Sequence, residues 1–180
     1  YRVQVKRGPT VSDDQRWEWV RTLLIREDIS LGPRVVGLLT LLFGVPVTRI
    51  VTLRRTAVTV DEEQVTVAFG PDPVQLPPRL AELLRRVIET PSRSPVAEDR
   101  WVFRGLRPGA HLANGSVSAA LRPAGISVQQ GRLVALMNLS RDLQPAVVAD
   151  LIGVTAVTAA RWSTHAGGDW SVYPMLRDSL

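Results

Sequence analysis

The sequence predicts a mainly α-helical α+β domain with one small antiparallel sheet. Apolar residues recur at helical spacing along most of the 180-residue chain, and only two short runs alternate as strands do. These runs, 57–60 and 64–69, are separated by three acidic residues, as the strands of a hairpin would be. A hydrophobic content of 45% can bury one good core, so we expect a single domain over residues 12–180.

Residues 1–11 are expected to be a linker or the tail of an upstream region, because they are basic and contain a Gly-Pro break at 8–9. The first helix is expected to begin at Ser12 or Asp13, since either side chain can cap the free amide groups of a helix start. The helical spacing of this segment predicts that its core residues are Trp17, Val20, Leu23 and Leu24.

A long apolar helix is expected after Gly32-Pro33, and the run Gly44-Val45-Pro46 is expected to interrupt it before a short helix over 48–53. The hairpin follows, and 72–73 is expected to close its second strand into a turn. The next helix has proline in its first turn, at Pro77, and a single apolar face. This face consists of Leu80, Leu83, Leu84 and Val87.

The last third of the chain is expected to be helical after an irregular loop at 91–99 and a buried run at 101–103. The expected helices cover about 115–124, 130–139 and 145–152, and a fourth begins at Thr155.

The formal net charge is +5, and arginine supplies nearly all of the positive charge. From Arg100 to Arg141 the sequence contains no aspartate or glutamate at all. This local bias favours an electropositive face that binds phosphate. A merely solvated surface is the alternative, since arginine is also frequent in chains encoded by GC-rich genes.

Several classes of function are not expected from this composition. The chain has no cysteine, and His111 and His165 stand alone in loop-like segments, so we expect no metal site and no other cofactor. No apolar run is long and uniform enough to span a bilayer, and no phosphate-cradling glycine loop occurs. We therefore expect a cytoplasmic protein with neither a membrane anchor nor a small-molecule substrate.

Segments across most of the chain occur in an order that is familiar from one group of DNA-cutting enzymes. They are 34–53, 77–88, the Trp-Val-Phe-Arg-Gly run at 101–105, 114–126 and the Ile-Gly-Val run at 152–154. In the order of these segments and in their residue patterns, the chain resembles the catalytic domain of the tyrosine recombinase (phage integrase) family. The resemblance implies that family's catalytic-core fold, which is mainly helical with a small antiparallel sheet, and a role on double-stranded DNA.

The catalytic groups of that family are largely missing at the matching positions. The family's paired arginines clamp the scissile phosphate, and a lysine, histidines and a nucleophilic tyrosine complete the reaction. Of these groups the resemblance retains only Arg132. The other matching positions carry Pro46 for the first arginine, Gln129, Leu133 and Val154 for histidines, and Ser163 for the tyrosine, and the hairpin has no lysine because the chain's only one is Lys6.

We therefore expect a catalytically inactive recombinase-like domain that binds DNA through backbone phosphates. Arg132 is the expected central contact, and the expected flanking contacts are Arg54, Arg55, Arg104, Arg107 and Arg122. One alternative is a protein-interaction module, for which exposed apolar residues are expected near Leu133, Val134 and Val154.

A second alternative is an active recombinase that uses Tyr173, which follows the Gly167-Gly168 pair and would have to fold back toward Arg132. The structural interpretation is that Tyr173 and Trp170 are aromatic anchors that pack the C-terminal segment onto the rest of the domain. The segment after Gly167 is a candidate for self-association, and an intramolecular tail is the other interpretation.

Overall fold

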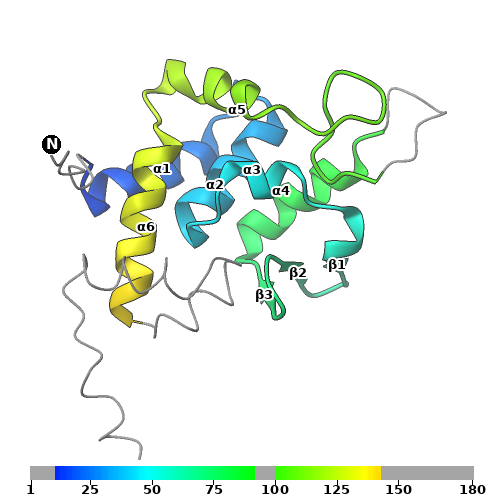
Figure 1. Cartoon of the computed structure of the whole chain (residues 1–180), viewed down its shortest axis with the longest axis horizontal. Helices are drawn as coiled ribbons and strands as arrows, with labels where there is room; N and C mark the ends of the chain where they lie inside the picture. Colours follow the sequence, from blue (N-terminus) through cyan, green and yellow to red (C-terminus); the bar gives the residue numbers. More distant parts are fainter. Residues whose placement is uncertain (1–10, 92–99, 143–180) are drawn as a thin grey trace, which may run out of the picture.

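The computed structural model describes residues 11–91 and 100–142, and its centre is the apolar helix α2 (Leu31–Phe43). Other helices surround α2 and pack against it (Figure 1). These are α1 (Asp13–Ile25), α3 (Val47–Val51), α4 (Pro78–Glu89), α5 (Asn114–Leu121) and α6 (Val128–Asp142). Short 3-10 turns, η1 (Arg55–Ala57) and η2 (Arg122–Ala124), follow α3 and α5.

Helix α2 is mainly apolar, and its residues from 33 to 41 are all buried, as is typical of a helix that is surrounded by others. Gly37 lets its neighbours approach closely, since a Cβ there would lie 2.9 Å from Leu23 Cδ1 and 3.0 Å from Leu121 Cδ1. The helix ends at Gly44, whose φ of +67° is the left-handed conformation that favours glycine. The predicted break before Pro46 is confirmed.

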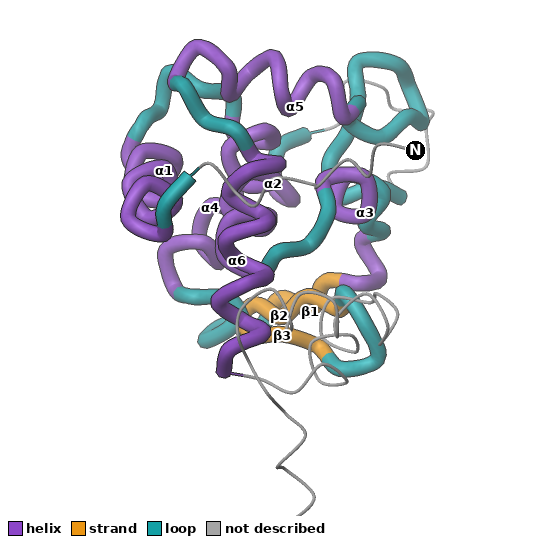
Figure 2. The backbone as a smooth tube through the Cα atoms, turned by 60° about the vertical axis from the view of Figure 1, so that its left-hand side comes forward, coloured by secondary structure: helices purple, strands orange, loops and turns teal. Residues whose placement is uncertain are grey.

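A three-stranded antiparallel sheet lies at one end of the molecule (Figure 2). Its order is β1 (Val58–Val60), β2 (Val65–Ala68) and β3 (Pro73–Gln75). The hairpin of β1 and β2 was predicted, but β3 was not, because its first residue is proline. Pro73 pairs with Ala68 at the edge of the sheet, where a missing N–H leaves no ladder position empty.

The predicted start of α1 is confirmed, since the Ser12 hydroxyl accepts a hydrogen bond from the Gln15 amide at 3.2 Å. The prediction that Trp17 lies in the core is wrong. Trp17 is 41% exposed, whereas Trp19 is 8% exposed and packs in the core with Val20 and Leu23. On a helix of 3.6 residues per turn, Trp17 falls about a third of a turn away from that apolar face.

Helices α4, α5 and α6 confirm the later helix predictions within a few residues, and the predicted apolar face of α4 is buried. The predicted linker up to residue 10, the loop over 92–99 and the helices over 145–152 and from Thr155 lie outside the described residues. No helix in the described part of the chain has both the length and the apolar character needed to cross a membrane.

Candidate nucleic-acid interface

Arg132 projects from α6 toward the end of α2 and is half-buried. Its Nε donates a hydrogen bond of 2.8 Å to the carbonyl oxygen of Gly44, 88 positions earlier in the chain. Burial lowers the pKa of the Arg132 guanidinium, because the charged form loses solvation. Gly44 stands two residues before Pro46, so the structure brings Arg132 to the segment where the resemblance puts the missing first arginine.

Arg55 and Arg104 converge on the C-terminal end of α4. The Arg55 Nη2 donates to the Ile88 carbonyl at 2.6 Å, and the Arg104 Nη1 donates to the Thr90 carbonyl at 2.5 Å. A second nitrogen of Arg104 lies 3.3 Å from the Ile88 oxygen. The last carbonyls of a helix have no partner within it and carry partial negative charge, so these two cations stabilise the end of α4.

Buried arginines act in the same way at the ends of α1 and α2, neither of which has a basic residue in its own last turn. Arg34 is 3% exposed and donates to the carbonyls of Leu23 and Leu24 at 3.0 and 3.2 Å. Arg16 donates to the Leu41 carbonyl at 2.7 Å. The side chains that bind helix ends are called the helix-end arginines below: Arg16, Arg34, Arg55, Arg104 and Arg132.

A second set, the solvent-facing arginines, consists of Arg54, Arg107 and Arg122, which are all exposed. The side chains of Arg107 and Arg122 form no hydrogen bond or ion pair with any other described residue. The Arg54 guanidinium carbon lies 5.9 Å from the centroid of the Trp101 ring. These side chains are free to meet an external anion without breaking a contact to the protein backbone.

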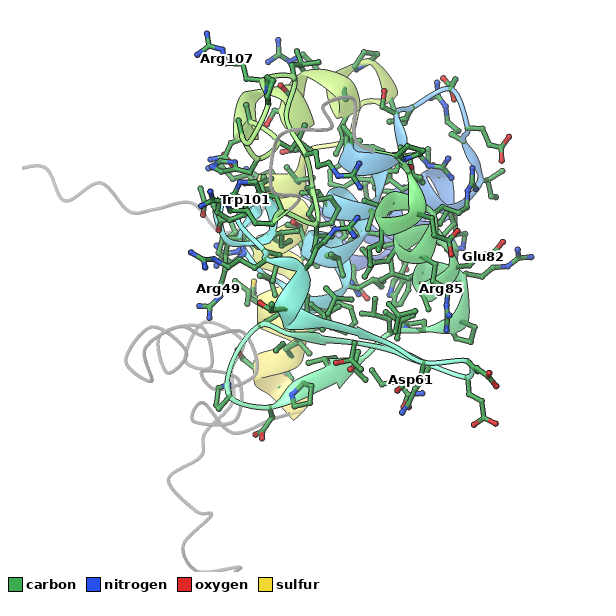
Figure 3. The ribbon with its side chains drawn as sticks, turned by 90° about the vertical axis from the view of Figure 1, so that its right-hand side faces the viewer. Arg49, Asp61, Glu82, Arg85, Trp101 and Arg107 are labelled. Atoms are coloured by element: carbon green, nitrogen blue, oxygen red, sulfur yellow. The ribbon has the colours of Figure 1, made fainter. Side chains whose placement is uncertain are left out.

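The loop over residues 100–112 pairs with the segment that carries Arg54. Val102 donates to the Leu53 carbonyl at 3.0 Å, and an antiparallel bridge joins Arg54 to Trp101. Figure 3 shows Arg49, Trp101 and Arg107 along one side of the molecule, while Asp61, Glu82 and Arg85 lie toward the other. Sequence reasoning missed Arg49, which is exposed on α3 and lies outside the stretch that lacks acidic residues.

The arrangement of these helices around α2, with a small sheet at one end, is similar to that in crystal structures of the XerH site-specific recombinase. A post-cleavage complex with a palindromic difH substrate matches with a TM-score of 0.66 and 17% identity, over 91% of this chain and 52% of that chain. The chain has a tyrosine recombinase-like fold. A pre-cleavage complex of XerH with difH gives a TM-score of 0.64 and 15% identity, over 90% and 52%.

The chain thus spans about half the length of these recombinase structures. Neither a protein-family model nor a curated protein matches the sequence. The likeness therefore rests on the arrangement of the elements rather than on sequence.

In this recombinase-like fold the packing of α6 bears on the alternative of a protein-interaction module, for which exposed apolar residues are expected near Leu133, Val134 and Val154. Val134 is only 5% exposed, and Leu133 is half-buried. Helix α6 lies close against α2 at Gly131, where an added Cβ would come within 2.2 Å of Leu41 Cδ2. Gln129 is exposed. The other positions matched to catalytic groups, Val154 and Ser163, lie outside the described residues, as does the candidate nucleophile Tyr173.

His111 lies in the loop over residues 100–112, but its side chain packs against the protein. It is half-buried, its ring meets Trp101 edge-on at a centroid distance of 5.4 Å, and its Nδ1 lies 2.9 Å from the Leu112 carbonyl. His165 lies outside the described residues. Over 11–91 and 100–142, no three histidine, aspartate or glutamate side chains gather as a metal site would require.

Proposed function

We propose that this chain is a catalytically inactive recombinase-like domain that binds double-stranded DNA through backbone phosphates. The observation that carries the proposal is the exposure of Arg107 and Arg122, without protein partners, in a stretch that has no acidic residue. The XerH structures of the same fold are complexes with a difH substrate, which supports a role on DNA. Cations that bind phosphates release counterions, so the affinity depends steeply on salt.

The six arginines predicted from the sequence do not contribute equally to this binding. We assign direct phosphate contacts to Arg54, Arg107 and Arg122, because they face solvent. We assign Arg55, Arg104 and Arg132 an indirect role in which they hold the backbone beneath the interface, since turning any of them outward would break a hydrogen bond to a helix-end carbonyl.

The inactivity of the domain is proposed from the same positions. Pro46 has no side-chain donor for a phosphate, and the Nε of Arg132 is held by Gly44. The turn between β1 and β2, where the resemblance expects a catalytic lysine, carries Asp61, Glu62 and Glu63. A single half-buried guanidinium binds a phosphate far more weakly than a bidentate pair of arginines.

DNA binding is tested by titrating a labelled duplex with the 180-residue chain between about 50 and 200 mM salt. We expect the logarithm of the association constant to fall linearly with the logarithm of the salt concentration. Replacement of Arg54, Arg107 and Arg122 together by alanine is expected to reduce the slope by about 3. The matched control is Arg79→Ala, an arginine on α4 whose side chain is 84% exposed, and it should leave the slope unchanged. Absence of binding at low salt would refute the proposal.

Inactivity is tested with a nicked suicide duplex, which traps the covalent intermediate of a recombinase. We expect no protein–DNA adduct from the chain. An adduct that forms with the unaltered chain and is lost in Tyr173→Phe would show instead that the domain cleaves DNA.

A further inference from the structure

The loop over residues 104–111, called the tip hairpin below, is held in one shape by its own backbone. The amide of Gly105 donates to the Ala110 carbonyl at 2.8 Å, and the amide of Ala110 donates to the Arg107 carbonyl at 3.1 Å. An antiparallel bridge between Arg104 and His111 closes its base. The segment is therefore a folded hairpin rather than an open loop.

Two glycines and Trp101 make this shape specific. A Cβ on Gly105 would lie 2.4 Å from the His111 carbonyl oxygen, so no larger residue fits there without a shift of the backbone. Gly109 has a φ of +73°, which favours glycine for a different reason. The indole Nε1 of Trp101 donates to the Gly109 carbonyl at 2.9 Å and ties the hairpin to the body of the domain.

The tip of this hairpin presents an apolar and a cationic side chain side by side. Leu106 is 95% exposed, and Arg107 and Pro108 are also exposed. A single exposed leucine is ordinary on a protein surface. This one is fixed beside an arginine without a protein partner, and Arg107 lies on the same side of the molecule as Trp101 and Arg49 (Figure 3).

We propose that the tip hairpin enters the minor groove of duplex DNA, with Arg107 directed at the groove floor and Leu106 against the sugars and base edges. This inference rests on the proposed DNA binding and adds where, and how, one contact is made. The minor groove is only about 6 Å wide, and it excludes a helix but admits a narrow tip. Its negative potential attracts arginine, and apolar side chains such as leucine are frequent partners of arginine in minor-groove proteins.

The major groove is a poorer match for the same tip. Readout there uses a helix or a two-stranded ribbon that presents several hydrogen-bonding side chains to the base edges. Leu106, Arg107 and Pro108 offer only one such group. Insertion into the minor groove makes the contact sensitive to the guanine 2-amino group, which projects from the groove floor.

The test compares otherwise identical duplexes with G·C or inosine·C pairs at the centre. Inosine lacks the 2-amino group, so it changes the minor groove and leaves the hydrogen-bonding pattern of the major groove as it is in G·C. We expect the chain to bind the inosine duplex about tenfold more tightly than the G·C duplex. In Arg107→Ala this preference is expected to disappear, and Leu106→Ser is expected to weaken binding to the inosine duplex severalfold.

Arg122→Ala is the matched control, because it removes another solvent-facing arginine outside the hairpin. It should lower the affinity for both duplexes by the same factor and keep the preference. Equal affinity of the unaltered chain for the two duplexes would overturn the minor-groove inference while leaving phosphate binding intact. Failure to bind either duplex at low salt would refute the proposed function itself, so the two failures are distinguishable. Circular dichroism of each variant checks that it is folded.

Discussion

The helix-end arginines and the solvent-facing arginines use one kind of side chain for different purposes. Arg34 is 3% exposed and donates hydrogen bonds to carbonyls at the end of α1. Arg107 is exposed and donates to no described residue. A guanidinium can bind either kind of group, because its planar fork of donors fits a cluster of carbonyl oxygens as well as it fits phosphate oxygens.

The contrast shows why an excess of arginine is weak evidence for DNA binding when it is taken alone. A carbonyl is neutral, so an arginine bound to it still counts fully toward the net charge of +5. Burial lowers the pKa of the Arg34 and Arg132 guanidiniums, yet arginine stays protonated in proteins. Support for phosphate binding therefore comes from the number of arginine side chains that donate to no carbonyl of the protein itself. Only the structure provides that number.

The largest effect is expected from Arg34→Ala. Its removal leaves the carbonyls of Leu23 and Leu24 without their donor in a buried place, so we expect a loss of about 3 kcal/mol in the free energy of unfolding. Urea denaturation measures this loss. DNA affinity, measured well below the denaturation midpoint, should stay within a factor of about two. A variant as stable as the unaltered chain would contradict the structural role.

Arg132→Ala is expected to have an intermediate and mixed effect. Loss of the bond to Gly44 should cost about 1–2 kcal/mol of stability, because the carbonyl of this buried glycine then loses a hydrogen-bond donor. We expect the DNA affinity to fall less than it does in Arg107→Ala. If Arg132→Ala instead weakens binding the most of all single variants, Arg132 is a direct phosphate contact and the division between the two sets is wrong there.

Arg122→Ala is expected to affect binding without affecting folding. Its side chain makes no internal contact of the kind that Arg34 makes, so the free energy of unfolding should change by less than about 0.5 kcal/mol. The salt slope for duplex DNA should become shallower by about 1, the value for one phosphate contact. A drop in stability comparable to that of Arg34→Ala would place Arg122 with the structural set.

The smallest effect is expected at the acidic turn of the sheet, in the double variant Glu62→Gln, Glu63→Gln. Both residues are exposed, and Asp61 beside them lies toward the side of the molecule away from Arg107 (Figure 3). At physiological salt the screening length is about 8 Å, so affinity for DNA should change by less than about twofold. A large increase would mean that this turn faces the phosphates as well.

The sequence carried enough information to predict most of the helices. Helical spacing and a capping serine predicted α1, and the proline-started apolar face predicted α4. The resemblance put Pro46 and Arg132 in one site, and that site stays a prediction. The structure shows that Arg132 binds the carbonyl of Gly44, two residues before Pro46. The roles of Arg55 and Arg104 were not readable, since nothing local distinguishes them from Arg54 and Arg107.

By itself the sequence determined the spacing of apolar residues along each element and the starts of the helices. It also determined the hairpin of β1 and β2 and the absence of a lysine from that hairpin. These follow from neighbours within a few positions, where propensity and spacing act. The tertiary structure alone decided that Trp19 rather than Trp17 is buried, that β3 joins the sheet, and which arginines bind carbonyls. Those outcomes depend on where distant helices end in space, as the 88 positions between Gly44 and Arg132 illustrate.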